Sequence, residues 1–457
     1  MRSEAEAEAL DGETTGLLPQ ADASMASERE QRYAAILRDS EMDKMTVEEK
    51  EAKKRTKYFM GGVYMAAMGV CGLVLVALGA TLTYLADMVG KQSTELGTVF
   101  LTRGIGAVSG AISSAKLYKW FSGNNVMFGG LVLIAGVMVA LIYNTSVLAL
   151  HIYFGLLGIA TAVVDTGVQI MTRKLHGKDA GPWLGANTVS FGCAGALVPL
   201  IEVIIGKTGA EFYVLAIWVA LVAIGILIVP SVEDVVNRGA GGGGPPPRPI
   251  QAHYNVEIVI SSMVFLYIGG KVTLTGYLYT FIDDTGMIDT DNETTALLVL
   301  WICITIGRLS GVYDQAYVNN TTLPWHLFVL SAGASLSMLT ILTFPRRGIA
   351  LWLGLSFFGL FNGPCVGYCY DMNNRLTAPS EESMAIVMLG LNMGASLVPW
   401  ITAEIWDANG NAFTLIWVVF LSNAMPILPI FFLKGLSYDP LVNPYLKRVA
   451  SEEDRLA

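Results

Sequence analysis

Residues 123–164 read GNNVMFGGLVLIAGVMVALIYNTSVLALHIYFGLLGIATAVV, without a single Lys, Arg, Asp or Glu. A helix that crosses the hydrocarbon core of a bilayer needs about 20 predominantly apolar residues. This stretch is long enough for two such helices, and the polar Asn144-Thr-Ser near its middle marks a turn between them. It therefore predicts two consecutive membrane-spanning helices.

The rest of the chain shares this apolar character. Of its 457 residues, 53% are hydrophobic and 15% are charged, and the mean hydropathy is +0.52. Soluble domains carry about 25% charged residues, so the composition excludes a water-soluble enzyme and gives no support to nucleic-acid binding. The apolar segments predict twelve spans, at 58–86, 96–117, 124–143, 147–171, 182–206, 212–230, 255–282, 294–316, 324–344, 349–372, 383–406 and 413–433.

The segment between the sixth and seventh spans contains Gly239-Ala-Gly-Gly-Gly-Gly-Pro-Pro-Pro-Arg-Pro249, a flexible glycine run followed by a stiffer proline run. The segment before the first span is polar and has little apolar surface to bury, as in disordered tails. We therefore predict an all-α membrane protein with a disordered N-terminal tail at 1–57, a six-helix bundle at 58–230, a linker at 231–254, a second six-helix bundle at 255–433 and a C-terminal tail at 434–457.

The two sets of six spans repeat one another. Three pairs of short motifs are offset by 201, 204 and 200 residues: Gly106-Ala-Val-Ser-Gly110 with Gly307-Arg-Leu-Ser-Gly311, Phe154-Gly-Leu with Phe358-Gly-Leu, and Leu197-Val-Pro199 with Leu397-Val-Pro399. Parallel six-helix repeats are the signature of the major facilitator architecture. The repeat thus predicts this fold, with transport by rocking of one bundle against the other about a central site.

Basic residues predict the orientation, because cytoplasmic loops of membrane proteins carry an excess of Lys and Arg. If both termini are cytoplasmic, 13 basic residues flank the spans inside and 4 lie outside; the inner ones are Lys53, Lys54, Arg55, Lys57, Lys116, Lys119, Arg173, Lys174, Lys178, Arg238, Arg248, Arg375 and Lys434, and the outer ones Lys91, Lys207, Arg346 and Arg347. In this orientation the glycosylation sequons at Asn144 and Asn292 lie outside, where glycans can be added.

Ionisable residues inside a membrane are costly and usually face a cavity or a partner. Asp165 lies deep in the fourth span, and Gln169 follows one turn later on the same helix face. Together they would present a charge and an amide to one cavity, which suits a solute rich in hydroxyl groups. The alternative is a structural ion pair or a polar cluster.

Lys271 is the least expected residue, because it follows Gly269-Gly270 midway along the otherwise apolar seventh span. We expect it to bind the solute, to act as a coupling charge or to pair permanently with an acid, of which Asp165 is the deepest in the other bundle. Three further side chains complete the predicted binding site, namely Tyr277, Tyr279 and Asn392. Arg103 and Arg308, beside the repeated glycine motifs, are candidates for coupling or for a gating ion pair, and equally for structural roles.

Several motifs together resemble the sodium-dependent glucose transporter-like branch of the major facilitator superfamily. They are Gly79-Ala-Thr-Leu82, Arg103-Gly-Ile-Gly106, Val164-Asp-Thr-Gly167, Phe265-Leu-Tyr-Ile-Gly-Gly-Lys-Val272, Gly276-Tyr-Leu-Tyr-Thr280 and the span-eight motif that begins at Gly307. The resemblance implies transport of a hexose or a similar polyol. One departure concerns coupling: the family usually carries a glutamate at the place of Lys271. Because an ammonium cannot coordinate sodium, we predict transport that does not depend on sodium.

The N-terminal tail contains Glu13-Thr-Thr-Gly-Leu17-Leu18, which is similar to the acidic dileucine signals that adaptor proteins read. This motif extends the choice of membrane from the plasma membrane to the endolysosomal membranes.

The sequence thus predicts a monomeric transporter of a small polar solute, most simply a sugar, that contacts membrane lipid and needs no cofactor or metal. An organic-anion facilitator or antiporter, held by Lys271 and an arginine, is the alternative within transport. A membrane sensor or accessory protein that moves nothing is the alternative from another class.

Overall fold

The computed structural model describes residues 47–176, 180–206, 209–232, 253–315, 317–319, 321–376 and 381–436. Of these, the residues from 57 to 232 and from 253 to 436 form one compact unit, and the helical segment 47–56 belongs to another. Most of the predicted tails and linker, and all of the dileucine motif with Glu13, Leu17 and Leu18, therefore lie outside the described residues.

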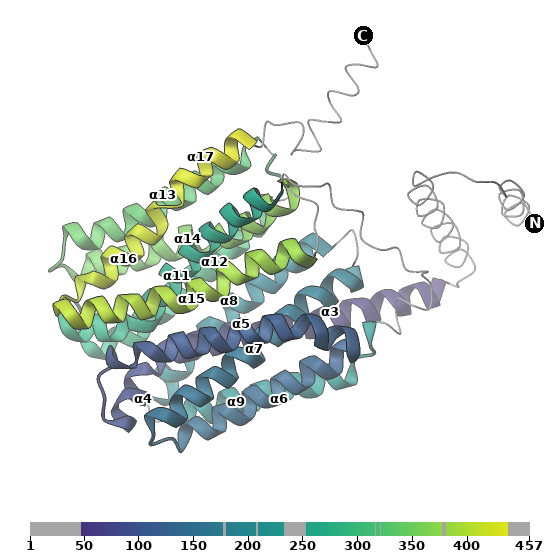
Figure 1. Ribbon diagram of the computed structural model, residues 1–457, viewed down its shortest axis with the longest axis horizontal. Helices are drawn as coiled ribbons and strands as arrows, with labels where there is room; N and C mark the ends of the chain where they lie inside the picture. Colours follow the sequence, from purple (N-terminus) through teal and green to yellow (C-terminus); the bar gives the residue numbers. More distant parts are fainter. Residues whose placement is uncertain are drawn as a thin grey trace, which may run out of the picture. The chain divides into compact units, whose positions relative to one another are not determined.

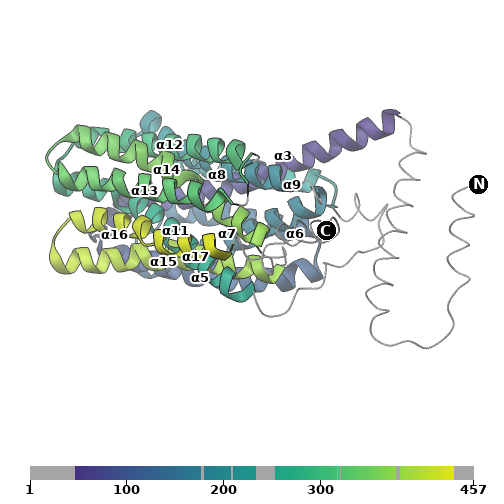
Figure 2. The ribbon, with the colours of Figure 1, turned by 90° about the horizontal axis from the view of Figure 1, so that it is seen from above.

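The described chain is almost entirely helical, and twelve of its segments are long and apolar enough to cross a membrane. Figures 1 and 2 show these helices running side by side. In chain order the elements are α3 (Val47–Ala80), α4 (Leu82–Val89), η1 (Glu95–Gly97), α5 (Thr98–Trp120), α6 (Gly123–Ile142), α7 (Val147–His176), α8 (Ala180–Ile205), α9 (Ala210–Ile228), α11 (His253–Thr285), η3 (Thr290–Asn292), α12 (Glu293–Gln315), α13 (Leu323–Thr343), α14 (Gly348–Leu376), α15 (Glu381–Asn409), α16 (Phe413–Ala424) and α17 (Ile427–Leu436).

The predicted all-α fold is confirmed, but two of the predicted spans are interrupted. The first span, expected at 58–86, ends at Ala80 and resumes as α4 after Thr81, whose Oγ1 donates to the Ala77 carbonyl over 2.6 Å. Such back-bonding by Thr often bends a helix. The last span divides into α16 and α17 at Met425-Pro426, because proline has no N–H to continue the backbone ladder.

Close helix pairs explain the repeated glycine motifs. A Cβ on Gly106 of α5 would lie 2.1 Å from the Gly155 carbonyl oxygen of α7. Likewise, a Cβ on Gly307 of α12 would lie 2.4 Å from the Leu360 carbonyl oxygen of α14. Glycine is the residue that allows such an approach of helix backbones. The same packing device thus holds α5 to α7 in the first half and α12 to α14 in the second.

The helices pack first within each half of the chain and then across the halves. In the first half α7 contacts α5 and α6, and α9 contacts α6; in the second α11 contacts α15, and α14 contacts α12 and α13 (Figure 1). Between the halves, α8 packs against α12 and α5 against α15. Apolar side chains such as Ile217, Leu221 and Ile228 on α9 remain exposed, as expected of a surface that faces lipid.

Candidate functional site

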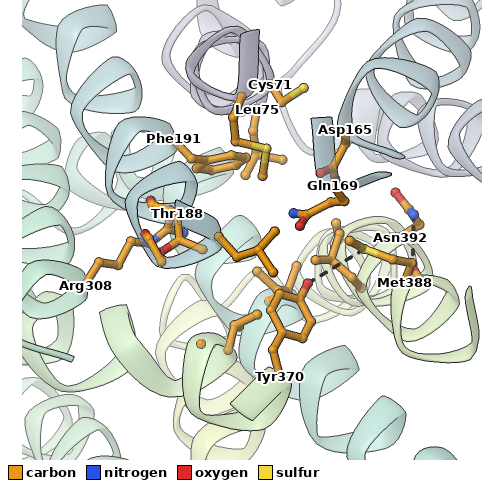
Figure 3. A pocket seen from close by; sticks show the side chains of 18 of the residues that line it. Cys71, Leu75, Asp165, Gln169, Thr188, Phe191, Arg308, Tyr370, Met388 and Asn392 are labelled. Atoms are coloured by element: carbon orange, nitrogen blue, oxygen red, sulfur yellow. Dashed lines mark hydrogen bonds between the residues drawn. The ribbon is translucent and has the colours of Figure 1, made fainter. Parts of the chain in front are cut away.

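A cavity of about 390 Å³ lies between helices of the two halves (Figure 3). Its polar lining comes from α5, α7 and α8 of the first half and from α12, α14 and α15 of the second: Arg103, Thr161, Asp165, Gln169, Arg173, Thr188, Arg308, Tyr370, Asp371 and Asn392. The cavity extends to the ends of α7 and α14, where Arg173 and Asp371 lie.

Asp165 and Gln169 line this cavity together, one helical turn apart on α7. Figure 3 shows both on one side of the cavity, with Arg308 and Thr188 on the other side. Asp165 is half-buried, and its Oδ1 atom is buried without a hydrogen-bond partner among the described residues. A buried acceptor without a donor is costly.

Arg103 reaches the same cavity from α5. The two helices are very close here, since a Cβ on Gly158 of α7 would lie 2.0 Å from the Arg103 carbonyl oxygen. The Arg103 side chain is only 7% exposed, and its Nε lacks a hydrogen-bond acceptor in the part of the chain that the structure describes. The arginine forms no ion pair with Asp165, although both line the cavity.

Arg308 does not form the predicted gating ion pair. Its Nη1 donates to the Thr188 carbonyl of α8 over 2.7 Å, and its guanidinium lies 4.8 Å from the centre of the Phe191 ring. Close packing of α8 on α12 brings this carbonyl within reach, because a Cβ on Gly192 would lie 2.8 Å from Thr305 Oγ1. Arg308 therefore links the two halves through a backbone oxygen and an aromatic face.

Lys271 does not line the cavity, and it does not pair with Asp165. Its side chain is completely buried, and Nζ has no hydrogen-bond partner within the described ranges. The rotation of α11 explains this: Ile268 faces the cavity, whereas Gly269 and Gly270 lie against Val398 of α15 and Ser422 of α16. Lys271 thus lies in the interior of the second half.

The two predicted binding tyrosines of α11 also lie away from the cavity. The Tyr279 hydroxyl donates to Glu202 Oε2 of α8 over 2.7 Å, and both side chains are buried. The Tyr277 ring packs 5.5 Å from that of Phe100 on α5 and 6.2 Å from that of Trp406 on α15, centre to centre. Both tyrosines contact residues of the first half, at the end of the helix bundle opposite to the end at which Arg173 lies.

Asn392 lines the cavity, and its Nδ2 donates to the Met388 carbonyl over 2.9 Å. Tyr370 is a lining residue that was not predicted from the sequence; its ring faces the cavity from α14, and its hydroxyl lies 3.8 Å from Met388 Sδ (Figure 3). The internal repeat could have indicated this residue. With the offset of 204 residues between spans four and ten, the position equivalent to Asp165 is the one directly before Tyr370.

The two glycosylation sequons differ in exposure. The Asn144 side chain is 4% exposed, and its Oδ1 accepts from the Ser146 N–H over 3.2 Å, as in an Asx turn. Its buried Nδ2 does not favour a glycan, in contrast to the prediction. Asn292 is exposed at the end of η3.

Comparison with known proteins identifies the class. The model of the Major Facilitator Superfamily matches residues 59–399, and the chain belongs to this superfamily. It is thus a multi-pass membrane transporter and not an enzyme, and its partner is a small-molecule solute.

The individual relatives share little sequence identity with this chain. The chain is 20% identical to the sodium-dependent glucose transporter 1A of Mus musculus over 378 residues, which cover 74% of this chain and 87% of the relative. It is 19% identical to the sodium-dependent glucose transporter 1 of Xenopus laevis over 358 residues, 72% of each chain. The xylose transporter XylE from E. coli, solved in a partially occluded inward-open conformation, has the same fold, with a TM-score of 0.68 and 14% identity over 83% of this chain and 98% of that one.

Proposed function

We propose that this protein moves a small sugar, a hexose or a related compound, across a membrane by alternating access. The observation that carries the proposal is the cavity between the halves, whose lining includes a carboxylate, an amide and a guanidinium, from Asp165, Gln169 and Arg103. A hydroxyl group both donates and accepts hydrogen bonds, so a sugar can bond to groups of all three kinds. The relatives named as glucose transporters support the same solute class.

The dimensions of the cavity fit this proposal. Its volume of about 390 Å³ lies near the lower end of the range for small-molecule sites, roughly 300–1,000 Å³. Asp165 and Gln169 belong to one half, and Tyr370 and Asn392 belong to the other. Movement of one bundle against the other would therefore change the contacts of a solute bound between them.

The basic residues support an orientation with both termini in the cytoplasm. In that orientation the cavity reaches toward the cytoplasm, at the ends of α7 and α14, and the Tyr279–Glu202 contact closes the outer side. The membrane is the plasma membrane or an endolysosomal membrane, the latter if the dileucine motif is read by adaptor proteins.

An organic-anion transporter is the second candidate, and one observation favours it: three arginines line the cavity, namely Arg103, Arg173 and Arg308. Lys271, which the sequence suggested as an anion ligand, is not among the lining residues.

Uptake of radiolabelled D-glucose and D-xylose into proteoliposomes tests the proposed function. We expect saturable uptake that continues without a sodium gradient, and the same vesicles with an imposed pH gradient reveal any coupling to protons. Vesicles that take up no sugar, neutral or charged, beyond protein-free controls would refute sugar transport. They would leave the organic-anion transporter or a non-transporting sensor.

A further inference from the structure

The cavity holds more positive charge than its acids balance. Three guanidinium groups line it, and none forms an ion pair with an acidic side chain in the described part of the chain: Arg103, Arg173 and Arg308. Arg103 and Arg308 are 7% and 8% exposed, so bulk water screens them little. Unpaired charges inside a membrane protein are expensive unless a partner or ligand compensates them.

The acids of the lining do not remove this excess. Asp371 is already paired within α14, since Arg375 Nη2 lies 2.8 Å from its Oδ2 and Arg375 Nε donates to its Oδ1 over 2.9 Å. Asp165 is the one lining acid that remains. Even if its charge is set against that of Arg103, the guanidinium groups of Arg173 and Arg308 stay uncompensated.

Arg308 has further donors beside the one that it directs at α8. Arg308 uses Nη1 for the Thr188 carbonyl, and its other N–H groups have no acceptor among the described residues. These groups are the donors with which a guanidinium holds a carboxylate or a phosphate in a bidentate manner.

From this arrangement we propose that the natural solute is an anionic sugar, a hexose that carries a carboxylate or a phosphate. Arg308 binds its anionic group, and Arg173 at the end of α7 adds a second positive charge to the lining. Asp165 with Gln169 binds its hydroxyl groups from the side of the cavity opposite to Arg308. This inference rests on the proposed sugar transport and narrows it, and it joins the two candidate solute classes in one molecule.

Direct uptake of three radiolabelled probes into proteoliposomes tests the inference: D-glucose, D-glucuronate and D-glucose 6-phosphate at equal concentration. We expect one of the two anionic probes to enter about tenfold faster than glucose, because hydrogen bonds to charged groups favour the anion by that order. The faster of the two arms identifies the anionic group as carboxylate or phosphate.

Substitutions then assign the residues. Arg308→Gln and Arg173→Gln should each lower the ratio of anionic to neutral uptake toward one, whereas Arg346→Gln, at an exposed position between α13 and α14, should leave the ratio unchanged. Arg173 is only half-buried, so its variant tests the inference even if Arg308→Gln fails to fold.

Three results would contradict the inference, each in a distinguishable way. Glucose uptake as fast as that of both anionic probes contradicts the anionic solute and leaves sugar transport intact. Absence of uptake of all three probes removes the proposed function together with the inference. A ratio that stays high in both arginine variants contradicts the assignment of these arginines.

Discussion

At the scale of single residues, Asp165 is the acid of the cavity lining that has no ion-pair partner among the described residues. Asp165→Asn keeps the volume and loses the charge, and one of its amide atoms becomes a donor. We expect uptake of the preferred solute to fall by about tenfold or more, because a hydrogen bond to a charged acceptor is worth roughly 1.5–3 kcal/mol. Initial uptake rates, normalised to the amount of protein in the vesicles, measure this change.

The matched control is Asp407→Asn, which alters an exposed aspartate near the end of α15 by the same chemistry. Its uptake should equal that of the unmodified protein. Full activity of Asp165→Asn would instead assign Asp165 a purely structural role.

Lys271 makes a separate test possible, because its amine is completely buried, lies outside the cavity and has no hydrogen-bond partner among the described residues. Replacing a buried charge by an apolar side chain of similar length is often neutral or stabilising, by about 1–4 kcal/mol. Lys271→Met should therefore raise the midpoint of thermal unfolding and preserve uptake, whereas Lys271→Glu should lower the midpoint. A lower midpoint and lost uptake in Lys271→Met would show that Lys271 pairs with an acid or with the solute in another conformation.

At the scale of helices, the backbone contact between α5 and α7 predicts the effect of a single methyl group. Gly106→Ala would place a Cβ 2.1 Å from the Gly155 carbonyl oxygen, so the two helices must separate. Overpacking of this kind costs about 1–3 kcal/mol, and we expect a lower midpoint of thermal unfolding.

Gly136→Ala on α6 is the control for this substitution, because a Cβ there meets nothing within 4 Å. It should be neutral or slightly stabilising, since alanine favours a helix over glycine by up to about 1 kcal/mol. Equal midpoints for the two variants would contradict the close approach of α5 and α7.

Helix positions could be predicted from the sequence, because runs without charge and their glycine and proline boundaries are local features. The direction of a side chain on a buried helix could not. Asp165 and Gln169 were predicted as a cavity pair because their spacing of four residues fixes them to one face. The pairing of Lys271 with Asp165, one of the alternatives for this residue, is absent in the structure, since the rotation of α11 depends on contacts of Gly269 and Gly270 with other helices. The partner of Arg308 is a backbone carbonyl, which no sequence motif marks.

At the scale of the whole transport unit, the two ends differ. At one end the cavity reaches Arg173, and at the other the halves are in close contact, where a Cβ on Gly79 of α3 would lie 2.5 Å from the Thr275 carbonyl oxygen of α11. Alternating access requires this closed end to open. The hydrogen bond from Tyr279 to Glu202 crosses between the halves there, so it must break in the other state.

Tyr279→Phe should therefore destabilise the closed end selectively. The variant loses a hydrogen bond to a buried carboxylate, worth roughly 1.5–3 kcal/mol, which shifts the ratio of closed to open states by about tenfold or more.

The separation of the two halves at this end can be measured between two spin labels. The labels are attached at Asp87→Cys on α4 and Asp289→Cys before η3, which are exposed positions on different halves. Cys193, an exposed native thiol, is replaced by Ser so that it is not labelled. Tyr213→Phe is the control, because it removes an equivalent hydroxyl contact, the 2.6 Å Tyr143–Tyr213 bond, within one half. We expect longer distances between the labels in Tyr279→Phe and an unchanged distribution in Tyr213→Phe. Identical distributions in both variants would mean that the apolar contacts around Tyr277 hold this end closed without help from the Tyr279 hydroxyl.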